Sequence, residues 1–197
     1  MTTTRLEAFS DGVFAIAITL LVIEIKVPTE TRGLARELGK LWPSYLGFVI
    51  SFLLIGLIWA NHHTMFEHIV HADRLLLFLN TLLLMNVAFL PFAAGVLAEA
   101  FRTGDGQRTA VVFYGSALVV GGIFFNAIWE YARRGHRLLA DTITARQAHT
   151  VSRRFLLGPA LYLLGVIVGA FQPIAGISLF ALLILVYWLP VTAREYD

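Results

Sequence analysis

The sequence predicts an all-α membrane protein with six transmembrane helices, on the basis of its composition and its apolar runs. Of its 197 residues, 58% are hydrophobic and only 14% are charged, whereas a soluble domain carries about 25% charged residues. A membrane-spanning helix needs about 20 apolar residues. Six runs of roughly this length cover residues 8–27, 43–64, 75–99, 109–132, 155–171 and 174–191. We expect one domain, residues 1–197, formed by these six helices.

Prolines, glycines and basic residues add detail to this prediction. Pro91 lies inside the third run and should kink that helix near Phe92. Gly165 and Gly169 form a G-x-x-x-G motif, which indicates close helix packing within or between subunits. Six crossings put both termini on one side, where the positive-inside rule indicates the cytoplasm. That side carries nine of the 15 Lys and Arg residues: Arg5, Arg74, Arg133, Arg134, Arg137, Arg146, Arg153, Arg154 and Arg194.

Composition argues against several other classes of protein. The chain has no cysteine, which excludes disulfides and thiolate chemistry. A sequence pI of about 9.2 could suggest nucleic-acid binding, but the net charge is only +2 and the basic residues flank apolar runs. We therefore expect no nucleic-acid partner. No nucleophile–base pair or metal-ligand motif is recognisable, so we expect neither an enzyme nor a bound metal ion.

The first apolar run is unusual because charged residues stand close to both of its ends. Asp11 and Glu24 are separated by twelve uncharged residues, about 18 Å of helix, whereas the hydrocarbon core is about 30 Å thick. Ionisable groups inside a membrane normally face protein or water, so this helix should lie in the interior of an assembly. Ile16, Leu20 and Ile23 share one face of it. That stripe could form rings around a symmetry axis or serve ordinary helix packing, and the pattern alone leaves both open.

The N-terminal half of the chain resembles a known family. The motif R-x-x-x-F-S-D occupies Arg5, Phe9, Ser10 and Asp11, at the head of the first run. Further matching positions follow in order: Trp59, Asn61-His62-His63, Asn80 and Leu90-Pro91-Phe92. Over about residues 5–95 the chain is thus similar to the transmembrane protein 175 family, which comprises potassium-permeable channels of endolysosomes and of bacteria.

The resemblance implies a homotetramer of six-helix subunits in a bacterial plasma membrane, with the first helix lining a central pore. Ile16 would form the narrowest constriction, Leu20 and Ile23 the next hydrophobic rings, and Thr19 the hydroxyl layer linked to potassium preference. The family has no carbonyl filter, and the sequence contains no Thr-Val-Gly-Tyr-Gly. Such a channel conducts potassium and other monovalent cations passively across the bilayer and needs no cofactor.

The polar residues of the motif have two possible roles. Ser10 or Asp11 could cap the first helix, with the arginine of the motif as a cytoplasmic anchor. In the family, however, the motif bonds to polar residues of neighbouring helices near the cytoplasmic mouth. We therefore expect a structural network with His63 and Asn80 as partners and with Trp59 packed alongside.

A histidine-rich segment provides an alternative function. His63, Glu67 and His71 are spaced i, i+4 and i+8, so one face of a continuous helix could present all three. Zinc and iron accept such ligands. The alternative is a metal- or proton-coupled transporter that uses Asp11, His63 and His71. Our first expectation is a juxtamembrane helix with a buried His63.

Overall fold

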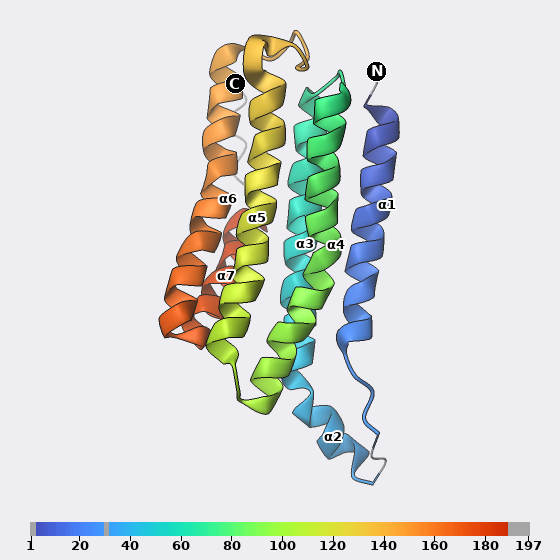
Figure 1. Cartoon of the computed structure of the whole chain (residues 1–197), viewed down its shortest axis with the longest axis vertical. Helices are drawn as coiled ribbons and strands as arrows, with labels where there is room; N and C mark the ends of the chain where they lie inside the picture. The colour runs from blue at the N-terminus through green and yellow to red at the C-terminus, as the bar shows by residue number, and fades with distance from the viewer. Residues whose placement is uncertain (1–2, 30–31, 189–197) are drawn as a thin grey trace.

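The computed structural model describes residues 3–29 and 32–188, and within them the chain is helical and strand-free (Figure 1). The two 3-10 turns are η1 (Leu21–Glu24) and η2 (Arg134–His136). The α-helices are α1 (Thr4–Leu20), α2 (Leu34–Lys40), α3 (Trp42–His68), α4 (Arg74–Thr103), α5 (Gln107–Arg133), α6 (Ala145–Phe171) and α7 (Pro173–Trp188).

The predicted runs correspond to helices in the predicted order, but the first ends earlier than predicted: its helical part stops at Glu24 and Ile25 is extended, so residues 25–27 are not helical. In the described part of the chain, five helical segments are long and apolar enough to cross a membrane: Thr4–Glu24, Trp42–His68, Arg74–Thr103, Gln107–Arg133 and Ala145–Phe171. The sixth run is shorter, apolar over Pro173–Leu185, and its predicted end at 189–191 lies outside the described residues, as does Arg194. A sixth crossing therefore stays a prediction. The sequence did not predict the seven-residue helix α2, which follows the left-handed Gly33 (φ 74°).

The long helices form a bundle in which α1 lies at one edge and α6 at the other, with α3, α4 and α5 between them (Figure 1). The face of α1 that packs against α3 and α4 carries Leu6, Ser10, Phe14 and Ala17, all buried. Their spacing of three or four residues is that of one helix face. Because α1 has its neighbours on one side, its opposite face is not covered by its own subunit.

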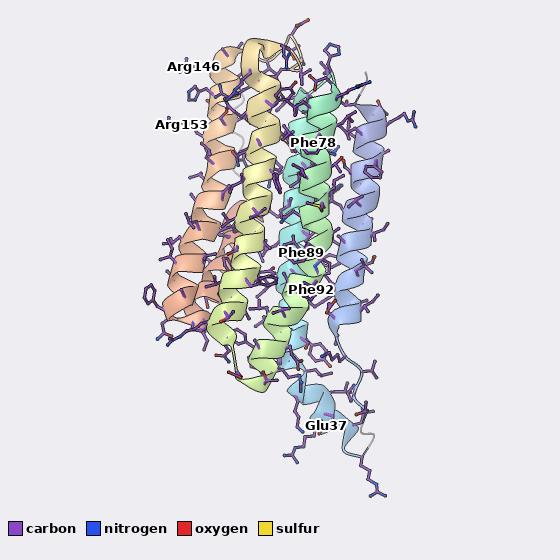
Figure 2. The ribbon with its side chains drawn as sticks, viewed as in Figure 1. Glu37, Phe78, Phe89, Phe92, Arg146 and Arg153 are labelled. Atoms are coloured by element: carbon purple, nitrogen blue, oxygen red, sulfur yellow. The ribbon has the colours of Figure 1, made fainter. Side chains whose placement is uncertain are left out.

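The helix α4 continues through the buried Pro91 without interruption. In Figure 1 the lower part of α4 leans away from α1, so the helix passes Pro91 without ending there. Phe78, Phe89 and Phe92 of this helix are labelled in Figure 2, and each is more than 40% exposed. This exposed aromatic stripe is a second apolar surface that the subunit leaves uncovered.

A helix cap and a backbone bridge fix the loops at the N-terminal end of the bundle. The carboxylate of Asp73 caps α4 by accepting a hydrogen bond from the backbone N–H of Leu76 at 3.0 Å. Residues that follow α5 pair with those that follow α3, through an antiparallel bridge between Ile69 and Leu139. The loop between α5 and α6 is thus fixed onto the loop between α3 and α4.

The glycine motif of α6 is used within the subunit. A methyl group on Gly165 would overlap the ring of Phe180 in α7, and one on Gly169 would overlap Val111 in α5. A Cβ on Gly176 of α7 would lie 2.6 Å from the Cα of Gly169. These glycines therefore let α6 approach α5 and α7 closely.

Candidate functional site

The uncovered face of α1 and its continuation into η1 carries the predicted constriction residues. Ile16 is 60% exposed, Leu20 40% and Ile23 70%. Phe14, two residues before Ile16, and Ala17, directly after it, are each only 1% exposed, because they face α3 and α4. The predicted stripe therefore does not serve packing within the subunit. It faces lipid, water or other copies of the chain.

Thr19 is exposed beside this stripe. Its hydroxyl donates a hydrogen bond to the carbonyl of Ile16 at 2.8 Å. A hydroxyl has one proton and two acceptor lone pairs, so a donated proton leaves the oxygen lone pairs directed outward. An oxygen presented in this way can accept a hydrogen bond from water or contact a cation.

The opposite face of α1 is held by a buried polar network. Asn80 of α4 donates from Nδ2 to the Ser10 hydroxyl at 2.9 Å, and Ser10 donates to the carbonyl of Leu6 at 2.8 Å. The Oδ1 of Asn80 lies 2.9 Å from Nε2 of His62. Because an amide oxygen only accepts, Nε2 is the donor in this arrangement. Ser10, Asn80 and His62 are each at most 1% exposed.

The prediction that a buried His63 joins this network is wrong. The histidine that is buried and contacts Asn80 is His62. His62 stacks on Phe66, with ring centroids 4.5 Å apart, and lies 5.4 Å from the ring of Phe14. His63 is one residue, about 100° of helix, further round. It is exposed and pairs with Glu67 at 3.6 Å. The buried positions of α3 carry the missed signal, since Ile55, His62, Met65 and Phe66 recur at helical spacing.

A second polar contact joins α1 to α3. The indole Nε1 of Trp59 donates a hydrogen bond to Oδ1 of Asp11 at 2.8 Å, and the indole ring stacks against His63. Trp59 therefore bonds directly to the motif, beyond the packing expected of it. Arg5 has no hydrogen-bond or ion-pair partner within residues 3–29 and 32–188, and Phe9 is 58% exposed. The subunit alone thus holds Ser10 and Asp11 but leaves Arg5 and Phe9 uncovered.

The histidine stripe does not form one helix face. The helix α3 ends at His68, and Ile69 is already extended, so His71 lies beyond the helix that carries His63 and Glu67. Among the residues described, no group of three or more His, Cys, Asp or Glu side chains is arranged to hold a metal ion. His63 and His71 therefore do not share one helix face, and the spacing that suggested a metal site does not produce one here.

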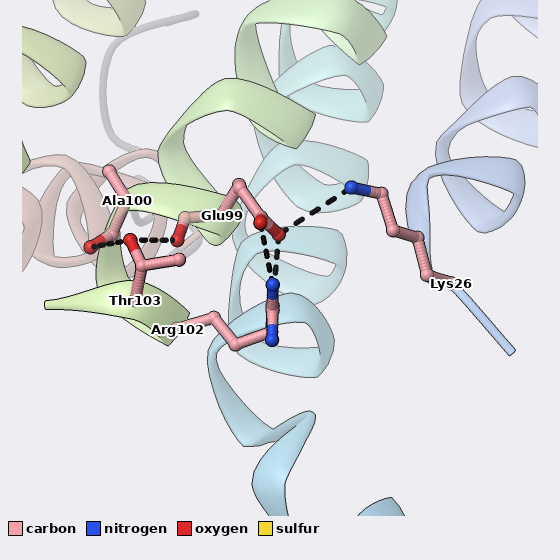
Figure 3. Close-up of polar contacts among 5 residues, drawn as sticks. All are labelled: Lys26, Glu99, Ala100, Arg102 and Thr103. Carbon is pink, nitrogen blue, oxygen red and sulfur yellow. Dashed lines mark hydrogen bonds and ion pairs between the residues drawn. The ribbon is translucent and has the colours of Figure 1, made fainter. Parts of the chain in front are cut away.

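The segment that follows α1 and η1 contacts α4 through an ion pair (Figure 3). Lys26 Nζ lies 3.6 Å from Oε2 of Glu99, and Arg102 donates to both oxygens of the same carboxylate at 2.9 and 2.6 Å. The side chain of Glu24 rests against Gly95, where a Cβ would collide with it. These groups border a cleft of about 800 Å³ between the segment after α1 and the turn between α4 and α5.

These features define a class of protein: an all-helical, multi-pass membrane protein whose first helix is anchored on one face and bare on the other. The family described as "Endosomal/lysosomal potassium channel TMEM175" matches residues 5–91. A relative named as a potassium channel, from Streptomyces collinus, is 42% identical over 97% of this chain and 95% of its own length. The chain belongs to the TMEM175 family.

A solved structure shows the fold of the family, and another relative carries a different name. The crystal structure of a lysosomal potassium-selective channel TMEM175 homolog from Chamaesiphon minutus has a TM-score of 0.85 and 36% identity. It covers 94% of this chain and 95% of its own. The TMEM175 of Danio rerio, named an endosomal/lysosomal proton channel, is 36% identical over 65% of this chain and 26% of its own length.

Proposed function

We propose that the chain is one subunit of a homotetrameric, potassium-permeable channel whose pore is lined by the exposed face of α1. The observation that carries the proposal is the contrast along this helix. Phe14 and Ala17 are buried within the subunit, whereas Ile16, Leu20 and Ile23 are exposed. The relatives from Streptomyces and Chamaesiphon are named as potassium channels, and this supports the proposal.

One subunit cannot enclose a path for ions, because α1 lies at the edge of its bundle (Figure 1). Copies arranged around an axis beside α1 would bring the three exposed side chains into rings. Rings of large aliphatic side chains exclude water from a narrow pore and so form a hydrophobic gate that opens when it widens. In this proposal Ile16 is the narrowest ring, and Leu20 and Ile23 form the next two.

Thr19 supplies the polar layer of the proposed pore. Its hydroxyl proton is committed to the carbonyl of Ile16 at 2.8 Å, so its oxygen faces outward as an acceptor. Four such oxygens around an axis would partly replace the hydration shell of a cation that passes between hydrophobic rings. Conduction is passive, and the chemistry needs no cofactor.

The polar network has a positioning role in this proposal. Ser10, Asn80 and His62 hold the buried face of α1 against α3 and α4, and Trp59 holds Asp11 nearby. Fixing one face determines which residues the other face presents. The uncovered Arg5 and Phe9, close to these bonds in sequence, are then available to a neighbouring subunit. We place this end in the bacterial cytoplasm, with both termini, from the distribution of arginine.

The alternative is a metal- or proton-coupled transporter that uses Asp11, His63 and His71. The name of the Danio rerio relative favours testing protons in particular. Purified protein in liposomes should release potassium down its gradient without added metal and without an opposing proton gradient. Its flux should rise linearly with the potassium gradient rather than saturate, and Ile16→Asn should increase it by making the narrowest ring polar.

A matched control is Leu163→Asn, an exposed position of α6 on the far edge of the bundle, which should leave flux unchanged. If neither the wild type nor Ile16→Asn conducts potassium, and uptake instead depends on a metal or on the proton gradient, the channel proposal is wrong. If protons alone pass, the pore proposal stands and its potassium permeability is wrong.

A further inference from the structure

The arginines between the end of α5 and the first three turns of α6 fall into two groups. Those at the end of α5 and just after it are paired with carboxylates: Arg133 and Arg134 with Glu130, and Arg137 with Asp73. Those on the first turns of α6 are exposed, and in the described part of the chain they have no carboxylate within ion-pair distance: Arg146, Arg153 and Arg154. Figure 2 labels two of them at the upper end of α6. Their charge is therefore available to an outside partner.

Arg154 stands beside an apolar crevice formed by α3, α5 and α6. Leu57 and Ile58 form its wall on α3, and Gly121 and Gly122 line it on α5. Its polar groups are mostly satisfied: the amide of Asn126 donates to the carbonyls of Gly122 at 2.9 Å and Phe155 at 3.1 Å. A crevice whose polar groups are already bonded favours an apolar occupant over water.

Below the arginines, the outer surface of α6 is apolar. Its exposed residues include Leu156, Leu157, Leu163, Leu164 and Ile167. Along α6, unpaired basic residues are therefore followed by leucine and isoleucine. This arrangement is typical of a helix surface that contacts lipid headgroups at one end and acyl chains further along. In Figure 1, α6 lies at the edge of the bundle opposite α1.

We propose that this crevice binds an anionic phospholipid, with one acyl chain in the crevice and the phosphate held by Arg154, which lines the crevice, and by the exposed Arg153, which precedes it on α6. Guanidinium groups form paired, charge-assisted hydrogen bonds with phosphate oxygens. Basic pockets between transmembrane helices are suited to anionic headgroups. The proposal rests on the proposed function only in placing the copies around α1, which leaves α6 on the lipid-facing perimeter.

Native mass spectrometry of delipidated protein titrated with phosphatidylglycerol or phosphatidylcholine tests this directly. The wild type should bind phosphatidylglycerol in preference. The double variant Arg153→Gln/Arg154→Gln should bind it about 30-fold more weakly, from the usual contribution of two interfacial arginines. The conservative pair Arg153→Lys/Arg154→Lys should restore most of the binding. The matched control, Arg36→Gln/Arg108→Gln, removes the same charge at the opposite end and should bind like the wild type.

Four results would overturn the proposal. Equal binding of both lipids, or unchanged preference in the double variant, would show that these arginines do not read the headgroup. Binding of glycerol phosphate as tight as that of phosphatidylglycerol, measured in the same titration, would show that the crevice plays no part. Loss of subunit association in the double variant, with lipid preference unchanged, would assign the surface to a neighbouring copy. None of these readouts depends on ion flux, so the channel proposal is tested separately.

Discussion

The Asn80 side chain joins α4 to α1 by donating a hydrogen bond to the Ser10 hydroxyl at 2.9 Å, while its oxygen accepts from His62. One amide thus satisfies two buried groups on two other helices. The three side chains sit where the subunit admits almost no solvent. Under these conditions a missing partner costs more than the bond itself contributes.

Replacing Asn80 with Ala should therefore destabilise the protein strongly. Ser10 and His62 would each lose a buried partner, at about 1–3 kcal/mol per group. Thermal unfolding in detergent measures the effect. The matched control is Asn61→Ala on α3, whose amide donates only to the carbonyl of Leu57 in its own helix, and which should cost far less. Equal losses in the two variants would contradict the role of the network.

His62 and His63 should respond differently to the same substitution. His62→Ala removes a buried ring that contacts Phe14 and Phe66 and leaves Asn80 without its donor, whereas His63→Ala alters an exposed side chain. We expect a clear fall in thermal stability for His62→Ala and a change within about 0.5 kcal/mol for His63→Ala. The opposite order would restore His63 as the partner of the motif.

Thr19→Val should reduce discrimination between potassium and sodium. Valine keeps the shape of threonine but removes the outward-facing oxygen. Bi-ionic flux in liposomes measures the ratio of permeabilities, which should fall while total flux persists. Thr81→Val is the control, because the Thr81 hydroxyl makes the same kind of bond to its own helix, on α4. An unchanged potassium-to-sodium permeability ratio in Thr19→Val would show that the Thr19 hydroxyl does not contribute to selectivity.

Asp73 should give the protein an acid-sensitive component of stability. The Tyr131 hydroxyl, the N–H of Leu76 and Arg137 together hold the pKa of Asp73 below its usual value of 3.8. A lowered carboxylate pKa stabilises the fold fully above the ordinary value and less as the pH falls through the lowered one. Melting temperatures from about pH 6 down to about pH 2 should fall less in Asp73→Asn than in the wild type. Asp141→Asn, an exposed control, should follow the wild type throughout.

The contact between α6 and α7 should be intolerant of a single methyl group. Gly176→Ala would place a Cβ 2.6 Å from the Cα of Gly169, which forces the two helices apart. Gly56→Ala meets nothing within 4 Å, and helix propensity favours it by up to about 1 kcal/mol. We expect Gly176→Ala to lower the melting temperature and Gly56→Ala to keep or raise it. Equal tolerance would mean that α7 packs differently.

The sequence was sufficient for features set by local pattern. Continuous apolar runs predicted every long helix, and the i, i+4, i+7 spacing placed Ile16, Leu20 and Ile23 on one face, which is uncovered in the subunit. The sequence was not sufficient where the result depends on the rotation of a helix about its axis or on contacts between distant segments. His62 and His63 differ by one residue, and the prediction overlooked the helical spacing of His62 with Ile55, Met65 and Phe66. The bridge between Ile69 and Leu139 joins two loops that are far apart in the sequence, and no local pattern indicates that they meet.

The central claim is that the exposed face of α1 lines the ion path, and cysteine accessibility tests it most directly. The chain contains no cysteine, so Ile16→Cys introduces a single thiol. A membrane-impermeant cationic thiol reagent should block potassium flux through Ile16→Cys in liposomes. It should leave Leu163→Cys on α6 conducting, as a control. Complete labelling of Cys at position 16, confirmed by mass, with flux unchanged would contradict the pore-lining role of α1.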